Sequence, residues 1–170
     1  MVQFAPQELA RWSRGTWNPA EPGLVQGVSH DTRTIQPGSL YIALQGQNFD
    51  GHQFVATAFS RGASGAVVQR DSPYEFPERK PLLYVDNSAD ALQAIAAAYR
   101  HKLSASIVAV TGSAGKTTVK QMIADMLSTA MPTARTRGNW NNAVGVPLSM
   151  LGMRPSDQAG VFEIGMNHPG

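Results

Sequence analysis

The alternation of apolar and polar residues predicts short strands and helices along the first hundred residues. Strands are predicted where short apolar runs are bounded by turn residues, at 39–44, 66–69 and 82–85. Helices are predicted where apolar residues recur every three or four positions, at 6–13, 54–59 and 89–103. We expect Ser88 to cap the last of these helices. Residues 15–23 are rich in glycine, proline and asparagine and are expected to form a loop.

A different pattern begins after a boundary that we place at residues 103–106. Residues 107–110 form a continuous apolar run, typical of a strand buried on both faces of a parallel sheet. A glycine-rich stretch follows, and then a helix that ends before Pro132. The apolar face of this helix, with its two methionines assigned to the core, is predicted to be Val119, Met122, Ile123, Met126, Leu127 and Ala130. Two further strands are predicted at 133–137 and 161–164, with a short helix between them at 147–151.

The order of these elements predicts an α/β protein in two parts. Residues 1–103 are expected to form a small mixed α/β domain. Residues 104–170 are expected to form the beginning of a larger domain with a parallel sheet and a phosphate loop, because such open sheets need more strands than this segment supplies.

Composition narrows the class of protein without identifying it. The chain has 170 residues, of which 42% are hydrophobic and 15% charged, so it has enough apolar material for a core. A net charge of +2 gives no strong reason to expect a nucleic-acid partner. The absence of cysteine excludes disulfide scaffolds, thiolate metal sites and cysteine nucleophiles, and it favours a cytoplasmic location. No apolar run is long enough to span a membrane and the N-terminus lacks a secretory pattern, so membrane insertion is not expected.

The strongest chemical signal is the glycine-rich stretch between strand and helix, Gly112, Ser113, Ala114, Gly115, Lys116, Thr117 and Thr118. Glycines let the backbone approach phosphate oxygens, and the loop amides with the helix N-terminus favour an anion. The Lys116 ammonium is expected to reach the terminal phosphates of ATP, and the Thr117 hydroxyl to bind Mg²⁺. Val110 stands where the general pattern has a glycine, so a glycine-rich turn with a chance lysine is the alternative.

Two later stretches, 136–148 (TRGNWNNAVGVPL) and 162–170 (FEIGMNHPG), together with this loop resemble the Mur ligases. These are ATP-dependent amide ligases of peptidoglycan precursor synthesis. The stretches are most similar to the members that join D-Ala-D-Ala to UDP-N-acetylmuramoyl-tripeptide, because the sister enzyme usually has Thr-Thr-Pro in place of Asn139–Asn142. Residues 29–33, 37–46 and 50–52 are similar to the UDP-sugar-binding domain of the family, with Thr32 where the family usually has serine. The resemblance covers residues 24–170.

The resemblance implies a reaction and a role for each motif residue. ATP would phosphorylate the terminal carboxylate of the UDP-linked tripeptide, and the amine of D-Ala-D-Ala would displace phosphate from the acyl phosphate. Lys116 and Glu163 would be catalytic, Thr117 and Glu163 would hold Mg²⁺, and Asn141 would join the phosphate loop in binding ATP. The UDP substrate would be bound by Asp31, Thr32, Arg33, Asp50, Gly51 and His52. A monomer is expected.

Several of these residues also have a purely structural interpretation. Glu163 could form a structural salt bridge, since a glutamate inside an apolar strand must be paired. The asparagines of 139–142 could only shape a loop. Asp50, Gly51 and His52 could form a turn and a helix cap, Arg33 could be solvated, and His168 could lie in a surface turn.

Other functions remain open on the sequence alone. The alternatives are a diamino-acid-adding or folylpolyglutamate-synthase-like ligase, a phosphate-loop GTPase, and a nucleotide-binding module without catalytic activity. The chain is expected to be the front part of a longer ligase and not to ligate by itself, because the remaining ATP contacts and the C-terminal domain of the family are missing from it.

Overall fold

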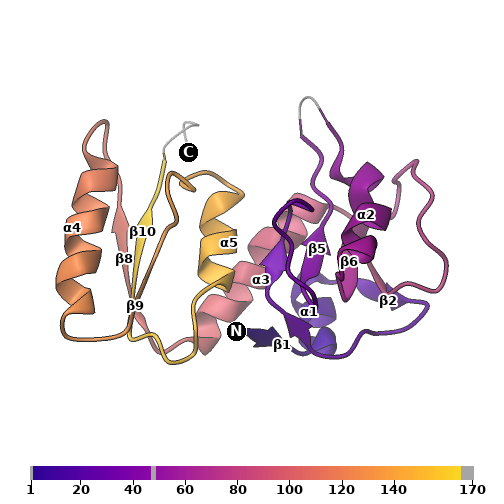
Figure 1. The fold of residues 1–170 in the computed structure, drawn as a ribbon, viewed down its shortest axis with the longest axis horizontal. Coiled ribbons are helices and arrows are strands. Elements are labelled where there is room, and N and C mark those ends of the chain that lie inside the picture. The colour runs from indigo at the N-terminus through magenta and orange to yellow at the C-terminus, as the bar shows by residue number, and fades with distance from the viewer. Residues whose placement is uncertain (1, 47–48, 166–170) are drawn as a thin grey trace. The chain divides into compact units, whose positions relative to one another are not determined.

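The computed structural model describes residues 2–46 and 49–165, so His168 lies outside the described residues. The chain divides into two compact units, residues 1–95 and 96–170 (Figure 1). The division falls inside helix α3 (Ser88–Lys102), a few residues before the boundary expected from the sequence. The extent of each functional domain therefore stays a prediction.

The first unit is built on a five-stranded sheet with the order β2-β7-β6-β5-β4. Strands β4 to β7 are parallel neighbours, whereas β2 pairs with β7 in the antiparallel direction. A separate antiparallel pair joins β1 and β3. The elements in chain order are β1 (Gln3–Phe4), α1 (Pro6–Ser13), β2 (Thr16–Asn18), β3 (Val25–Gln26), β4 (Val28–Ser29), β5 (Leu40–Ile42), η1 (Gly51–Phe54), α2 (Val55–Ser60), β6 (Gly65–Gln69) and β7 (Leu82–Val85), followed by α3.

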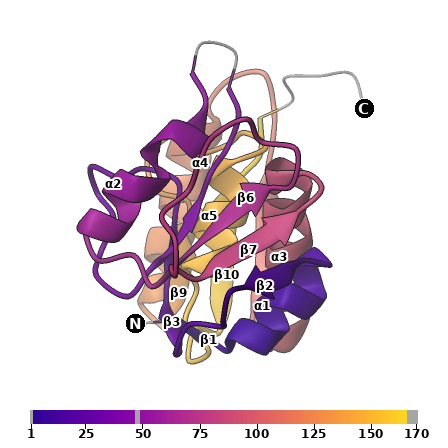
Figure 2. The ribbon, with the colours of Figure 1, turned by 90° about the vertical axis from the view of Figure 1, so that its right-hand side faces the viewer.

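Alternation along the central strands divides their side chains between two buried faces. Tyr41, Val68 and Leu82 belong to the core that includes Val55 and Ala58 of α2. The intervening side chains, such as Ile42, point to the opposite face and are also buried. Figure 2 shows α2 and α3 on opposite sides of this sheet. Burial on both faces explains why β5, β6 and β7 have nearly continuous apolar sequences.

The second unit is a three-stranded parallel sheet with the order β8-β10-β9. Helices α4 and α5 lie on opposite sides of it (Figure 1). The elements are β8 (Ser106–Val110), α4 (Lys116–Ser128), β9 (Thr133–Arg135), α5 (Gly145–Leu151) and β10 (Ala159–Glu163). Val110 of β8 and Val161 of β10 pack with Ala124 of α4, so this cluster forms the core between the sheet and the helix.

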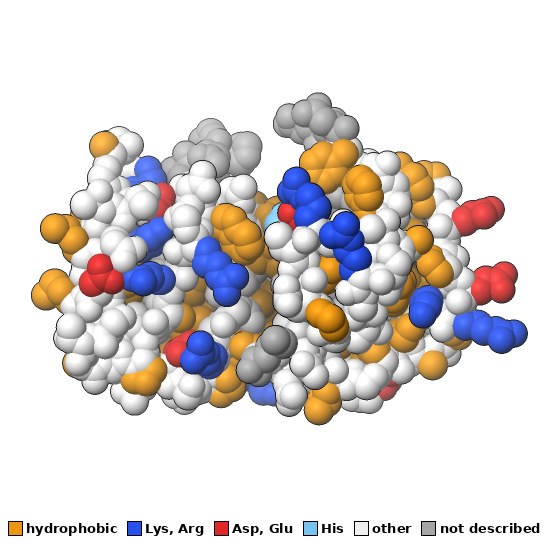
Figure 3. All heavy atoms as spheres, in the orientation of Figure 1, with side chains coloured by type: hydrophobic (Ala, Val, Ile, Leu, Met, Phe, Trp, Pro, Cys, Tyr) orange, Lys and Arg blue, Asp and Glu red, His pale blue; other side chains and the backbone are white. Residues whose placement is uncertain are grey.

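The predicted apolar face of α4 is partly wrong. Met122 and Met126 are 62% and 74% exposed, and Val119 is also exposed, whereas Lys120 and Ala124 are buried. Apolar side chains therefore protrude from the outer side of α4 (Figure 3). Only Ile123 and Leu127 of the predicted stripe pack on the sheet core. The apolar spacing predicts the wrong face because Lys120, which pairs with the buried Glu163, occupies an inward position of the helix.

Three smaller expectations also differ from the structure. The predicted loop at 15–23 contains strand β2, which is too short to show an alternating pattern. Asn87 caps α3 in place of Ser88, because its Oδ1 accepts hydrogen bonds from the amides of Ala89 and Asp90 at 2.8 and 3.0 Å. Strand β8 is not buried on both faces, since the Ala109 side chain is exposed.

Candidate nucleotide and metal site

The phosphate loop lies between the end of β8 and the start of α4, as its sequence predicts. Gly112 and Gly115 have φ values of +145° and +76°, a backbone region that side chains rarely adopt. Gly115 is the N-cap of α4, so the first backbone amides of this 13-residue helix lie beside the phosphate loop. Lys116 Nζ donates to the Gly112 carbonyl oxygen at 2.7 Å and lies across the loop. Val110, in place of the usual glycine, is buried in the sheet core.

Glu163 lies beside this loop because of the strand register. It is the last residue of β10 and pairs with Val110, the last residue of β8. The Glu163 residue is 2% exposed, and its carboxylate accepts hydrogen bonds from Thr117 Oγ1 and Asn141 Nδ2, each at 2.8 Å. The backbone amide of Glu163 donates to Thr136 Oγ1 at 3.0 Å. The structure thus brings together Thr117, Asn141 and Glu163, which the sequence predicts to share one site.

Lys120 is a site residue that the sequence analysis missed. Its side chain is 3% exposed, and Nζ donates to the Gly138 carbonyl oxygen at 2.7 Å and lies 3.5 Å from Glu163 Oε2. A signal was available in the spacing, since Lys120 follows Lys116 by four positions and Thr117 by three and therefore shares their helix face.

Glu163 is held as a carboxylate. Burial opposes its ionisation, but the hydrogen bonds from Asn141 and Thr117 and the charge of Lys120 outweigh burial, so the pKa of Glu163 is lowered. A buried carboxylate beside a threonine hydroxyl is a donor set that suits Mg²⁺, which takes oxygen ligands and usually one or two protein carboxylates. In the described part of the chain, no group of three or more histidine, cysteine or acidic side chains forms a cage for another metal.

The asparagine-rich loop contributes to both the site and the fold. Asn139 and Asn141 line an open pocket of about 370 Å³ together with Gly115, Lys116, Thr117, Thr118 and Glu163. Asn142 has a structural role, because its Oδ1 accepts from the amides of Val144 and Gly145 at the start of α5. Loop shaping is thus observed for Asn142, whereas ligand contact by Asn139 and Asn141 stays a prediction.

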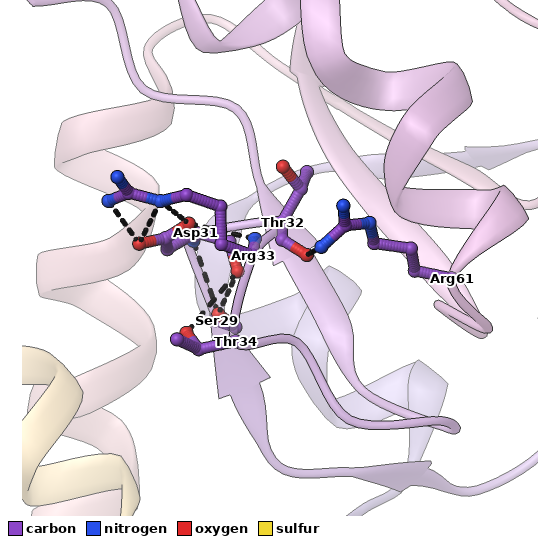
Figure 4. Close-up of polar contacts among 6 residues, drawn as sticks. All are labelled: Ser29, Asp31, Thr32, Arg33, Thr34 and Arg61. Atoms are coloured by element: carbon purple, nitrogen blue, oxygen red, sulfur yellow. Dashed lines mark hydrogen bonds and ion pairs between the residues drawn. The ribbon is translucent and has the colours of Figure 1, made fainter.

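The predicted UDP-binding residues of the first unit form two small clusters. In the first, Arg33 donates to both carboxylate oxygens of Asp31, with Nε 2.9 Å from Oδ1 and Nη2 2.7 Å from Oδ2 (Figure 4). The hydrogen bond from Arg33 is the main reason that the pKa of Asp31 is lowered to about 2. Arg61, which the sequence analysis did not single out, donates to the Thr32 carbonyl oxygen at 2.9 Å. The Arg33 side chain is 83% exposed.

The second cluster consists of Asp50, Gly51 and His52, and its contacts are internal. Asp50 caps η1, and the His52 ring is buried with Nδ1 on Asp50 Oδ1 and Nε2 accepting from the Gln69 amide at 3.0 Å. Both ring nitrogens are therefore used within the protein. Gly51 lies so close to Leu44 that a Cβ would be 2.7 Å from its backbone nitrogen. The structural interpretation holds for these contacts, and substrate contact stays a prediction.

Family models match both units of the chain. A model described as "Mur ligase family, catalytic domain" matches residues 24–100, and one described as "Mur ligase middle domain" matches residues 110–170. The chain belongs to the Mur ligase family. The predicted resemblance and the α/β fold class are confirmed.

Individual Mur ligases agree with the family models. The UDP-N-acetylmuramoyl-tripeptide--D-alanyl-D-alanine ligase of Bacillus subtilis (strain 168) is 38% identical over the whole chain, which spans 37% of its length. A crystal structure of MurF from Acinetobacter baumannii matches 99% of the chain with a TM-score of 0.88 and 35% identity, and the match covers 37% of that protein. MurF ligase from Thermotoga maritima in complex with ADP matches 86% of the chain with a TM-score of 0.72 and 29% identity, over 33% of its length. The chain thus spans about a third of the length of the Mur ligases it matches. No helix in residues 2–46 and 49–165 could cross a membrane.

Proposed function

We propose that this chain provides the UDP-substrate-binding part and the phosphate-binding part of a cytoplasmic ligase that joins D-Ala-D-Ala to UDP-N-acetylmuramoyl-tripeptide. The observation that carries the proposal is the buried Glu163 carboxylate beside Thr117 at the mouth of the phosphate loop. The names of the relatives supply the substrates, and the ADP complex of the Thermotoga maritima ligase supports ATP as the phosphoryl donor.

The residues of the pocket suit transfer of a phosphoryl group to a carboxylate. Lys116 and the loop amides would bind the phosphates of ATP, and Asn141 would orient Glu163. Thr117 and Glu163 would hold Mg²⁺, which when bound neutralises charge on the phosphate oxygens. The acyl phosphate formed with release of ADP would then react with the amine of D-Ala-D-Ala, and phosphate would leave. Asp31, Thr32 and Arg33 would bind the UDP group.

A chimera tests the substrate. Residues 1–170 are joined to the remaining two thirds of the Bacillus subtilis relative, and phosphate release is measured with ATP, Mg²⁺ and UDP-N-acetylmuramoyl-tripeptide. D-Ala-D-Ala is expected to stimulate release, whereas a diamino acid offered with the UDP-linked dipeptide is not. Stimulation by the diamino acid alone would overturn the proposed substrate.

The 170-residue chain tests the nucleotide. Titration calorimetry is expected to detect ADP and ATP binding that Mg²⁺ strengthens, and gel filtration is expected to show a monomer. The same chain is expected not to ligate. Failure of any nucleotide to bind would remove the basis for the phosphate-loop assignment.

A further inference from the structure

Lys120 is the one lysine of α4 that points into the protein. Its neighbour Lys116 is only partly buried and lies across the phosphate loop, whereas the Lys120 side chain is 3% exposed. The Lys120 ammonium reaches two different segments, because Nζ donates to the Gly138 carbonyl oxygen and lies 3.5 Å from Glu163 Oε2. One side chain thus connects α4, the loop after β9 and the end of β10.

We propose that Lys120 is a positioning residue for the magnesium–nucleotide site, holding both the Glu163 carboxylate and the loop that carries Asn139 and Asn141. This inference rests on the proposed function, since it assumes that the pocket binds a nucleotide with Mg²⁺. Lys120 does not line the pocket itself. Its effect would therefore be exerted through its two partners.

The contact with Glu163 fixes which carboxylate oxygen faces which partner. Oε2 lies between Thr117 Oγ1 and Lys120 Nζ, while Oε1 receives Asn141 Nδ2. Two donors from α4 and one from the loop after β9 therefore leave the carboxylate little rotational freedom. A carboxylate held in one orientation before the cation arrives loses less entropy when it binds.

The contact with Gly138 controls the loop. Gly138 has a φ of +51°, and its carbonyl oxygen accepts from Lys120 just before the two pocket-lining asparagines. The loop is also held at its far side, where the Gly165 amide donates to the Asn141 carbonyl oxygen at 2.7 Å. Without Lys120, we expect residues 138–141 to lose the hydrogen bond that holds them at Gly138 and to keep the one at Asn141.

Stability alone is a poor explanation for this arrangement. Exchanging a buried ion pair for apolar side chains of similar volume is often neutral or stabilising, so a buried lysine is not needed to hold α4 on its sheet. Ala124, one turn further along the same face, packs there without any charge. The position of Lys120 is distinguished by its two polar partners, since Glu163 lines the pocket and Gly138 directly precedes the pocket-lining Asn139.

The test compares Lys120→Met, which keeps the aliphatic length, with Lys120→Arg, which keeps the charge and the donors. Gln121→Met is the matched control, because Gln121 is exposed on the same helix and hydrogen-bonds only to Asp125 among the contacts described. For each 170-residue variant, the dissociation constant of ADP is measured by calorimetry with Mg²⁺ and with a chelator. The ratio of the two constants isolates the metal-dependent part of binding.

We expect Lys120→Met to reduce the strengthening of ADP binding by Mg²⁺ by about tenfold, with a smaller effect on ADP alone. Lys120→Arg should restore part of the ratio, and Gln121→Met should leave it unchanged. Hydrogen exchange of the amides in 138–142 should accelerate in Lys120→Met and not in the control. A purely structural lysine would lower the melting temperature and leave the ratio intact, which would overturn the inference.

Three further outcomes are decisive. Stronger Mg²⁺ dependence in Lys120→Met would mean that Lys120 repels the cation, which contradicts a positioning role. If the variants do not fold, the test uses the NMR resonance of the Lys120 ammonium in the wild-type chain labelled with ¹⁵N-lysine. This resonance is expected to shift more on addition of magnesium–ADP than on addition of ADP alone. An unchanged resonance would overturn the inference. Failure of the wild-type chain to bind ADP would instead contradict the proposed function.

Discussion

Thr117 Oγ1 donates a hydrogen bond to Glu163 Oε2 at 2.8 Å, although 46 positions separate the two residues in the chain. The first belongs to the start of α4 and the second to the end of β10, and the parallel pairing of β8 with β10 brings them together. Two oxygen donors that suit Mg²⁺ are therefore adjacent at the carboxyl ends of neighbouring strands, where open α/β sheets bind their ligands.

Replacing the phosphate-loop lysine should weaken nucleotide binding. Lys116→Met removes the ammonium that would meet the terminal phosphates, and charge-assisted hydrogen bonds contribute about 1.5–3 kcal/mol each, so ADP affinity should fall at least tenfold. Calorimetric titration of the 170-residue chain measures the loss. Lys80→Met is the control, since it removes the same charge from the first unit. Unchanged ADP affinity in Lys116→Met would contradict the assignment of the loop.

Glu163→Gln should uncouple nucleotide binding from Mg²⁺. The amide keeps the size of the side chain and one acceptor for Asn141, but it removes the negative charge that a divalent cation needs. The variant should bind ADP equally well with Mg²⁺ and with a chelator. Its free energy of unfolding should fall by about 1–3 kcal/mol, because the buried Lys120 ammonium loses its charged partner. Mg²⁺-strengthened binding in the variant would place the metal elsewhere.

The orientation of α4 predicts that two substitutions close together in the helix change the free energy of unfolding by very different amounts. Met126→Lys should change the free energy of unfolding by less than about 0.5 kcal/mol, because this side chain is 74% exposed. Ala124→Leu should cost about 1–3 kcal/mol, because Ala124 is fully buried against Val110 and Val161. Urea denaturation of the two variants measures both values. The reverse order would restore the helix face predicted from the sequence.

The ion pair of Asp31 and Arg33 should give a pH-dependent contribution to stability. The folded-state pKa of Asp31 is lowered to about 2, below its value in the unfolded chain, so the contribution is present above the unfolded pKa and is lost as pH falls through the folded pKa. Because Arg33 is exposed, the difference between wild type and Asp31→Asn at pH 7 should be no more than about 1 kcal/mol. Urea denaturation between about pH 5 and pH 2 should show the two proteins converging. A difference that is constant over this range would exclude the ion pair as its source.

The chemistry of the site was predictable where function restricts local sequence. The strand, glycine turn and helix around Lys116 form one continuous pattern, and Glu163 was recognisable as an acidic residue at the end of an apolar strand. The short strands β5, β6 and β7 were also predictable, because burial on both faces makes them continuously apolar.

The remaining features depend on contacts between distant segments. The spacing of Lys120 from Lys116 and Thr117 puts the three residues on one helix face, but only the positions of Glu163 and Gly138 show that Lys120 faces inward. The same contact explains why Met122 was wrongly assigned to the core. The role of His52 could not be assigned either, because one of its partners is the Gln69 amide at the end of strand β6.

The pairing of Glu163 with Val110 has a consequence for how the protein acquires its site. Successive side chains of a strand point to opposite faces, so a shift of β10 by one residue would turn the carboxylate toward α5 and bring an apolar neighbour to the phosphate loop. The carboxylate therefore reaches Thr117 only after β8 and β10 have paired in the correct alignment. In a refolding experiment, the rate at which magnesium-dependent nucleotide binding returns would therefore report the rate at which this sheet is completed.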